Sequence, residues 1–189
     1  MNVPLTHAAE GLERRAFSVQ DVIRMVEMGV LGREERFELI GGEIVPMSPK
    51  GIRHERLKQW LNEQLVKNLP PSLQTIPETS FYLSDDTFIE PDFVVYPRES
   101  GLENLSPQTC LLAIEIADSS LAYDLGRKAQ LYAEFGIREL WVIDVGTMTT
   151  TIHRSPAGSA YSDIARREAS AQLVPSMFAG LTVDLSRYA

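Results

Sequence analysis

The chain has 189 residues, 44% of them hydrophobic, and a formal net charge of −8. This length suits one domain with its own core, and no apolar run is long enough to span a bilayer. The negative charge argues against broad, non-specific adhesion to nucleic acid, which a basic surface would favour. It does not exclude an enzyme that acts on nucleic acid, because clustered site carboxylates are themselves negative and a metal ion can offset them.

The start of the chain and its cysteine content suggest an ordinary intracellular protein. Residues 1–15 lack the apolar segment of a signal peptide, so residues 1–17 are expected to form a flexible tail and residues 18–189 a single domain. Cys110 is the only cysteine and lies in an apolar stretch, which excludes a disulfide within the chain and indicates a buried small hydrophobe. A reducing cytoplasm is the simplest location for such a chain.

The first half of the chain alternates helical and hairpin patterns. Ser18 is a good N-cap for a helix that runs to about residue 28. Residues 37–40 and 43–47 flank a Gly-Gly pair and predict a β-hairpin whose turn uses positive φ angles. A helix over residues 52–69 has its leucines on one face and is stopped by a Pro-Pro pair.

The second half predicts mainly strands, with one further long helix. The helix covers residues 123–135 and ends at Gly136, a natural first residue after a helix. Strand pieces and a short helix complete the C-terminus. The pattern favours an α/β or α+β fold in which helices flank a mixed central β-sheet, with an N-terminal helix and β-hairpin. The expected strands lie near residues 74–76, 80–83, 91–96, 111–116, 140–145 and 149–153.

Three charged residues stand in segments that are otherwise apolar. Asp92 opens a buried-strand pattern that follows a proline, and Glu115 interrupts a second apolar run. Lys128 falls at the centre of the apolar stripe of the helix that comes next. A buried, unpaired charge is costly, so charges retained in such places are usually paired or hold a metal ion.

Each of these charges also has an ordinary explanation. Lys128 can pair with Asp124, one turn earlier on the same helix face. Glu115 can form a structural ion pair with an arginine, and Asp92 can cap a turn. Taken together, however, two carboxylates on neighbouring strands suit a hard divalent cation such as Mg²⁺, which lowers the pKa of bound water and neutralises phosphate charge. With a lysine to orient the attacking water, the three charges predict a metal-dependent phosphodiesterase.

Six ordered segments resemble the Uma-two family of predicted endonucleases, which is widespread in bacteria. This family belongs to the PD-(D/E)xK superfamily of the restriction-endonuclease-like fold. The resemblance runs from about Ser18 to the C-terminus, and it implies that fold and an endonuclease activity on DNA. The segments are residues 37–49, His54, and residues 90–95, 113–120, 123–132 and 135–144.

The chain departs from the superfamily pattern at one position. The usual lysine lies two residues after the acid, where this sequence has Ala117. In the family's pattern the lysine comes from the following helix, which here offers Lys128, with Asp124 to steer it. The resemblance also makes Glu38 a further metal or water ligand, and His54 a phosphate-binding or acid–base group. The alternatives are an exposed strand position for Glu38 and a helix-surface histidine for His54.

One stretch of the chain is clearly basic. It comprises Lys50, Arg53, Arg56 and Lys58, interrupted by a single acid, Glu55. A solvated helix face and a patch that contacts phosphate both explain such a pattern, and the sequence leaves the two open.

The sequence therefore predicts a Mg²⁺-dependent endodeoxyribonuclease, in which Mn²⁺ can replace Mg²⁺. Asp92 and Glu115 are expected to bind the ion, with the carbonyl of Ile116 as a third protein ligand, and Lys128 to position the hydrolytic water. The alternative is a binding or assembly module that kept the fold and lost efficient cleavage. Cutting both strands of a duplex favours a homodimer. No membrane partner is expected.

Overall fold

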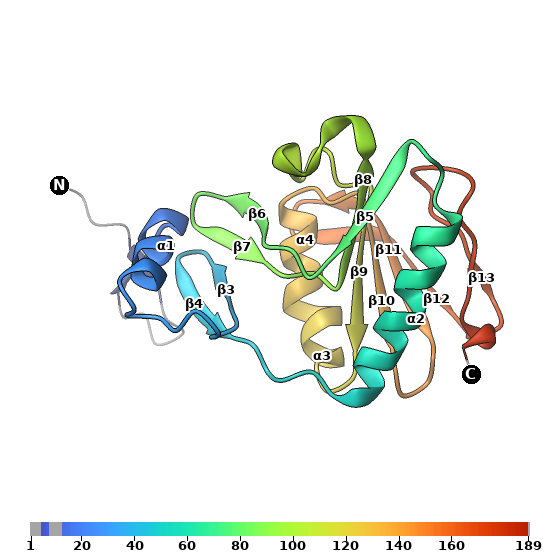
Figure 1. Ribbon diagram of the computed structural model, residues 1–189, viewed down its shortest axis with the longest axis horizontal. Coiled ribbons are helices and arrows are strands. Elements are labelled where there is room, and N and C mark those ends of the chain that lie inside the picture. Colours follow the sequence, from blue (N-terminus) through green and yellow to red (C-terminus); the bar gives the residue numbers. More distant parts are fainter. Residues whose placement is uncertain (1–4, 8–12, 189) are drawn as a thin grey trace. The chain divides into compact units, whose positions relative to one another are not determined.

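The computed structural model describes residues 5–7 and 13–188 of the chain (Figure 1). Among these residues, no helix is both long and apolar enough to cross a membrane. The tail predicted over residues 1–17 lies partly outside the described residues. Where this part is described, two short strands, β1 (Leu5–His7) and β2 (Glu13–Arg15), pair antiparallel. The predicted boundary between a tail and a single domain stays a prediction.

The described residues form two compact units. The first unit extends through Pro49 and takes in Ser80–Glu90 from later in the chain. The second unit comprises Lys50–Thr79 and the chain from Pro91 onward. The chain therefore passes between the units three times.

The first unit contains an antiparallel sheet of four strands in the order β4-β3-β7-β6, and one helix. A small core joins the helix to the sheet, with Val19, Val22 and Leu39 buried at its centre. The elements besides β1 and β2 are α1 (Val19–Glu27), β3 (Phe37–Ile40), β4 (Glu43–Pro46), β6 (Phe81–Ser84) and β7 (Thr87–Ile89).

Two local predictions for the first unit are confirmed. Ser18 is the N-cap of α1, and it forms a reciprocal capping box with Asp21 in which each side chain accepts from the other's backbone N–H. The hairpin of β3 and β4 turns at Gly41 and Gly42, which have φ angles of 56° and 79°. Two consecutive positive φ angles are what a two-residue hairpin turn of this twist requires, and glycine adopts them without strain.

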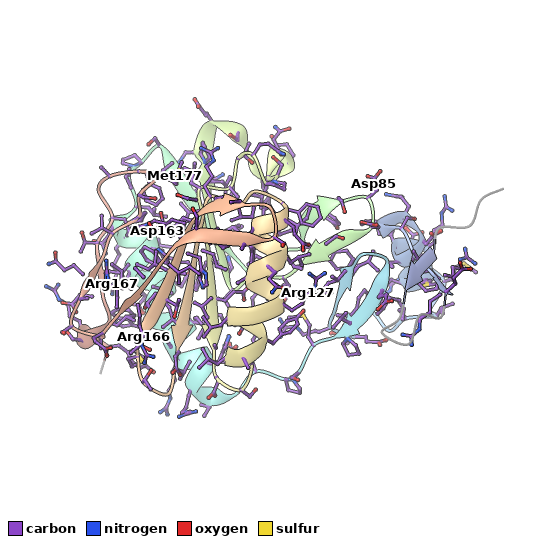
Figure 2. The ribbon with its side chains drawn as sticks, turned by 180° about the vertical axis from the view of Figure 1, so that it is seen from behind. Asp85, Arg127, Asp163, Arg166, Arg167 and Met177 are labelled. Atoms are coloured by element: carbon purple, nitrogen blue, oxygen red, sulfur yellow. The ribbon has the colours of Figure 1, made fainter. Side chains whose placement is uncertain are left out.

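The second unit is built on a mixed sheet of six strands in the order β12-β11-β10-β9-β8-β5. Only β9 and β10 are parallel, and the other neighbours are antiparallel. Strand β12 is one edge, and Asp163, Arg166 and Arg167 project from it (Figure 2). The strands are β5 (Leu73–Pro77), β8 (Phe93–Pro97), β9 (Leu112–Ala117), β10 (Glu139–Asp144), β11 (Thr150–Ala157) and β12 (Ala160–Arg167).

Helices cover both faces of this sheet (Figure 1). On one face, α2 (Ile52–Asn68) buries a leucine stripe against the apolar side chains of β8, β9 and β10, which form the main core. On the other face lies a continuous helical segment that connects the parallel strands β9 and β10. It consists of α3 (Leu121–Tyr123), a π-helical turn η3 (Asp124–Lys128) and α4 (Ala129–Glu134).

The fold class predicted from the sequence is confirmed, as are most of its elements. The sheet is mixed, helices flank it, and Gly136 follows the last helix with a φ of 74°. Strand β7 and the π-helical turn were not predicted. The remaining elements of the second unit are η1 (Arg98–Ser100), η2 (Leu102–Asn104), β13 (Gln172–Leu173), β14 (Val183–Asp184) and η4 (Leu185–Arg187).

Candidate active site

The start of β8 and the end of β9 bring two acidic side chains together. These strands are antiparallel, and Phe93 pairs with Ile114. One step further along the same register, Asp92 lies opposite Glu115. Phe93 and Ile114 belong to the core under α2. Because side chains alternate across a sheet, the acids of the next pair lie on the opposite face, which α3, η3 and α4 cover.

Asp92 is almost completely buried and accepts hydrogen bonds from three directions. Its carboxylate takes the backbone N–H of Ile116 at 2.7 Å and the ammonium of Lys50 at 2.7 Å. The Nε2 atom of His54, near the start of α2, lies 3.1 Å away. With 3% of its surface exposed, Asp92 depends on these donors in place of water. These contacts go beyond the turn-capping role that was the alternative for Asp92.

Glu115 forms the second half of the cluster with two residues of the covering helix. Its Oε1 atom accepts from the hydroxyl of Tyr132 at 2.5 Å and lies 3.0 Å from the ammonium of Lys128. All three side chains are buried. As its place in the apolar stripe of the helix predicts, the Lys128 side chain points at the sheet, where it pairs with Glu115.

A π-helical turn presents Lys128 to the sheet. In η3 the N–H of Ala129 donates to the carbonyl of Asp124, five residues earlier. Such turns interrupt α-helices mostly at functional sites. Asp124 is also buried, and it accepts a hydrogen bond from the hydroxyl of Ser120. Its negative charge acts on Glu115, so it belongs to the same electrostatic cluster. Arg127, next to Lys128 in the sequence, points outward and is about half exposed (Figure 2).

The sequence did not single out a second layer of charges around Asp92. The Lys50 ammonium lies 2.7 Å from both Asp92 and Glu78, and the Lys58 ammonium is 3.0 Å from Glu78. Lys58 also pairs with Glu55. Glu78 has a φ of 48°, which is unusual for a residue with a side chain, and its N–H donates to the Asp92 carbonyl at 3.3 Å. Two of the four basic residues in the predicted stretch, Lys50 and Lys58, thus point toward the charges around Asp92.

Two other predicted auxiliary residues have different outcomes. His54 is buried and faces Asp92, so the alternative of a helix-surface histidine is wrong. Glu38 is not an exposed strand position either, because only 3% of its surface is exposed. It lies in the first unit, where its carboxylate accepts the backbone N–H of Glu90 at 3.1 Å. Its part in a site with Asp92 stays a prediction.

Burial and neighbouring charges move the pKa values of these acids apart. Burial opposes ionisation of Asp92, but the hydrogen bond from His54 and the charge of Lys50 outweigh it and lower the pKa of Asp92 to about 2. Burial raises the pKa of Glu115 to about 8, against the attraction of Lys128 and with the repulsion of Asp92 added. Two neighbouring carboxylates with pKa values so far apart are characteristic of reactive sites.

The donor set suits a hard divalent ion that keeps most of its water. In the part of the chain that the structure describes, no three side chains of the His, Cys, Asp and Glu types converge as a closed metal cage. Mg²⁺ does not need one, because it commonly binds through one or two carboxylates and retains several waters. Asp92 and Glu115 supply two such carboxylates. The ammonium groups of Lys50 and Lys128 neutralise them within the protein.

Comparison with known proteins gives one family and one fold. The Uma2 family model, described as "Putative restriction endonuclease", matches residues 19–186. A solved structure from Anabaena variabilis ATCC 29413, described as a "putative nuclease belonging to DUF820", superimposes with a TM-score of 0.71. The two chains share 16% identity over 90% of this chain and 96% of the other. None of the curated proteins compared with this chain matches it.

The structural likeness establishes the fold alone, and it confirms the predicted restriction-endonuclease-like architecture. The family match extends from the first residue of α1 into η4 and therefore includes every residue of the buried charge cluster. With nearly the whole chain matched, this protein belongs to the Uma2 family, as its six sequence segments predict.

Proposed function

We propose that this protein is a Mg²⁺-dependent endonuclease that hydrolyses phosphodiester bonds in DNA. The observation that carries the proposal is the burial of Asp92, Glu115 and Lys128 together where β9 ends and β8 begins. Two acids and a lysine at a sheet end are the groups that this chemistry needs. Membership of a family described as a restriction endonuclease supports the reaction class.

In this proposal Asp92 and Glu115 hold the ion, and the carbonyl of Ile116 is the third protein ligand. When bound, the ion lowers the pKa of a coordinated water and offsets charge on the scissile phosphate. Lys128 directs its ammonium at the attacking water and at the phosphate oxygens, where negative charge grows in the transition state. Because Lys128 already lies 3.0 Å from Glu115, it reaches any water that Glu115 binds.

Three further residues hold these groups in position. The Tyr132 hydroxyl fixes the orientation of Glu115, and the Ser120 hydroxyl does the same for Asp124. His54 lies against Asp92 and orients it from the start of α2. A site supported in this way loses little free energy to reorganisation during the reaction.

One observation favours a second candidate, a nuclease-fold binding module without efficient cleavage. The carboxylates are already neutralised by protein cations, with Lys50 on Asp92 and Lys128 on Glu115. A buried network satisfied in this way is stable without a metal ion. In a working nuclease, the ion has to compete with these ammonium groups for the carboxylate oxygens.

Two measurements separate the candidates. We expect Mg²⁺ or Mn²⁺ to raise the melting temperature of the wild type, and the Glu115→Gln variant to lose this shift. We expect the wild type to cut plasmid DNA with either ion and Lys128→Met to cut it at least 100-fold more slowly, as is typical on the order of magnitude for loss of a positioned catalytic group. Glu63→Gln, on the exposed side of α2, is the control.

Metal binding without cleavage by the wild type supports the binding module. A metal-induced shift that survives in Glu115→Gln contradicts the assignment of the ion to this site. Retained cleavage in a folded Lys128→Met protein contradicts the role of the lysine.

A homodimer and a cytoplasmic location complete the proposal. Two active sites in a dimer can cut both strands of a duplex in one binding event, and β12 is an edge strand with Ile164 58% exposed, which offers a surface for a second copy. The molar mass from light scattering tests this, because a monomer at all accessible concentrations contradicts it. The free, buried thiol of Cys110 suits the reducing cytoplasm where the chain would meet DNA.

A further inference from the structure

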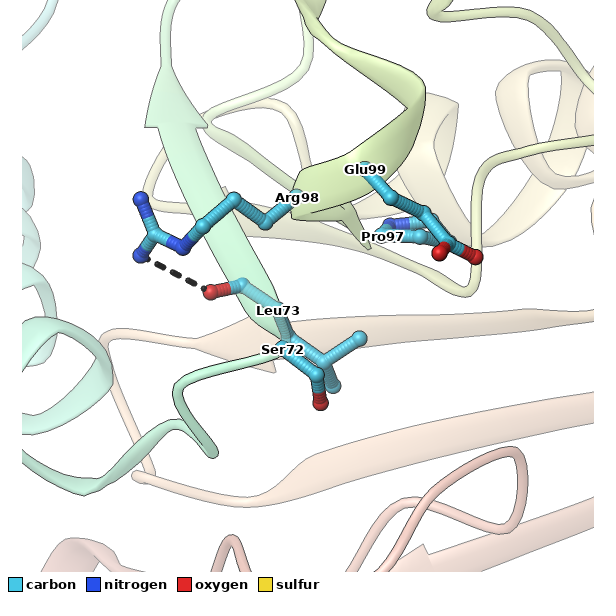
Figure 3. A pocket seen from close by; sticks show the side chains of 5 residues that line it. All are labelled: Ser72, Leu73, Pro97, Arg98 and Glu99. Atoms are coloured by element: carbon cyan, nitrogen blue, oxygen red, sulfur yellow. Dashed lines mark hydrogen bonds between the residues drawn. The ribbon is translucent and has the colours of Figure 1, made fainter.

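Two hollows border the sheet of the second unit near α2 and β5. One is lined by Ser72, Leu73, Pro97, Arg98 and Glu99 (Figure 3). Its one cationic group is already used, because the Arg98 guanidinium donates to the backbone carbonyls of Pro71 and Leu73. These hydrogen bonds stabilise the start of β5, and they leave the guanidinium little capacity to bind a ligand. The second hollow differs in this respect.

The second hollow lies along α2 and begins directly beside Asp92. One wall is the helix, and the other is formed by the end of β5 and the residues around Asp92. Its volume is about 300 Å³, at the lower end of the range of small-ligand sites, which suits one nucleotide unit. Its lining residues are Ile52, Glu55, Arg56, Lys58, Gln59, Asn62, Pro77, Glu78 and Phe93.

The polar groups on the helix wall are free to bind a ligand. Arg56, Gln59 and Asn62 follow one another at three-residue spacing, so they form a row on one side of α2 that is about 9 Å long. None of these three side chains hydrogen-bonds or ion-pairs with another residue in the described part of the chain. Together they offer a ligand the guanidinium group of Arg56 and the side-chain amides of Gln59 and Asn62.

The local charge of this hollow differs from that of the whole chain. The acids Glu55, Glu78 and Asp92 are matched by ammonium groups, since Lys58 pairs with the first two and Lys50 with the last two. The guanidinium of Arg56, which has no ion-pair partner among the described residues, brings these three acids and two lysines to neutrality and lies at the exposed end of the row. Its planar fork suits a phosphate group, which it can bind through two hydrogen bonds.

We propose that this hollow, the α2 groove, binds the nucleotide of the DNA strand next to the scissile phosphate. Arg56 contacts that nucleotide's phosphate, and Gln59 and Asn62 hydrogen-bond to its sugar and base. The groove begins beside Asp92, because Glu78 and Phe93 both adjoin Asp92 and line the groove. The groove positions the substrate through one strand, so an acidic protein needs no broad basic surface. This inference rests on the proposed nuclease function.

Binding of a fluorescein-labelled, single-stranded oligonucleotide of mixed sequence tests the groove. Fluorescence anisotropy is measured in EDTA, where no cleavage occurs, at several salt concentrations. We expect Arg56→Ala to weaken binding about tenfold and to reduce the slope of log Kd against log salt by about one, because one phosphate contact is lost. Gln59→Ala with Asn62→Ala is expected to weaken binding with an unchanged slope, because these side chains carry no charge.

Arg127→Ala is the matched control, since it removes the same charge from an exposed helical position on the other face of the sheet. All substituted positions lie on helices, where alanine is favourable, and urea unfolding checks that the variants fold. The inference is wrong if Arg56→Ala matches the wild type and Arg127→Ala in affinity and in slope. If the wild type cuts DNA and Arg56→Ala behaves like it, the groove is wrong and the nuclease stands. If the wild type neither binds nor cuts DNA, both proposals fail.

Discussion

Tyr132 is the residue whose role can be separated most clearly from general stability. Its hydroxyl donates to Glu115 at 2.5 Å, deep inside the protein. A second buried tyrosine, Tyr161, donates to the backbone carbonyl of Ile137 at 2.7 Å and takes no part in the charge cluster. The two tyrosines therefore provide similar buried hydrogen bonds, one at the proposed active site and one outside it.

We expect Tyr132→Phe and Tyr161→Phe each to lower the free energy of unfolding by about 1–3 kcal/mol, because each removes a hydrogen bond to a buried acceptor. Only Tyr132→Phe should also slow DNA cleavage, since Glu115 then loses the bond that orients it. Urea unfolding and plasmid cleavage measure the two effects. Equal cleavage by the two variants would assign Tyr132 a structural role alone.

The residues that sequence reasoning could find are those that contradict a periodic pattern. Asp92, Glu115 and Lys128 stand out because each is charged where its strand or helix is apolar. Lys50 is visible in the sequence only as part of a basic stretch, and Glu78 lies just after a strand, where a polar residue is ordinary, so nothing in the sequence assigns either of them to Asp92. Only the folded chain brings them to Asp92.

A buried charge is also not always a functional one. Glu139 begins an apolar strand, much as Asp92 precedes one, and it is completely buried. Its carboxylate accepts from the indole of Trp141, from Arg154 and from Ser176, and so it connects β10 to β11 and to the C-terminal segment. What distinguishes Asp92 and Glu115 is that each lies within reach of the other's charge.

Among the helices and strands, the sequence predicts the ones that are marked by a pattern in their own residues. The capping box of α1, the leucine stripe of α2 and the continuous apolar run of β10 each indicate an element without long-range information. Strand β7 is too short to show alternation over its three residues. The π-helical turn cannot be seen in an apolar stripe assigned at the α-helical period, although that stripe still places Lys128 on the side facing the sheet.

The hairpin of β3 and β4 shows how one glycine can matter more than its neighbour. Both Gly41 and Gly42 have positive φ angles. A Cβ atom on Gly41 would meet nothing within 4 Å, whereas one on Gly42 would lie 2.5 Å from the Cβ of Ala16 and 2.9 Å from backbone atoms. The backbone of Gly42 also bonds to Phe17 and Asp86 on either side, which leaves it little room to move.

We therefore expect Gly41→Ala to lower the free energy of unfolding by about 1–2 kcal/mol, the cost of a left-handed conformation for alanine. Gly42→Ala should be clearly more destabilising, because it adds a steric clash with backbone to the same conformational cost. Urea unfolding of the two single variants compares them directly. Similar losses in both would mean that Ala16 and the backbone at Phe17 can shift away.

At the scale of the whole molecule, the buried charges make stability depend on pH in two opposite directions. The Glu78 carboxylate is partly buried, which opposes its ionisation, but the bonds from Lys50 and Lys58 outweigh this and lower its pKa from 4.5 to about 2. The pKa of Asp92 is lowered from 3.8 to about 2. A carboxyl group with a lowered native pKa stabilises the fold above its unfolded pKa, and that stability is lost as the pH falls toward 2.

Glu115 acts with the opposite sign. Burial raises its native pKa to about 8 from 4.5 in the unfolded chain, so the folded protein holds this proton more tightly. Its stabilising contribution is complete below pH 4.5 and declines as the pH rises toward 8. The cluster as a whole should therefore be most stable in mildly acidic solution, between the range in which Asp92 and Glu78 gain protons and the range in which Glu115 loses one.

We expect urea unfolding at a series of pH values to give a free energy that falls on both sides of this optimum. Glu78→Gln should flatten the acidic side, and Glu115→Gln should flatten the alkaline side, because each variant removes the group that titrates there. Glu78→Gln also lowers stability at neutral pH, since Lys50 loses an anionic partner, so the slopes and not the absolute values carry the comparison. An alkaline side that is as steep in Glu115→Gln as in the wild type would show that a different group releases the proton. The affinity of the wild type for Mg²⁺ should rise over the same alkaline range, because the ion and the Glu115 proton compete for one carboxylate.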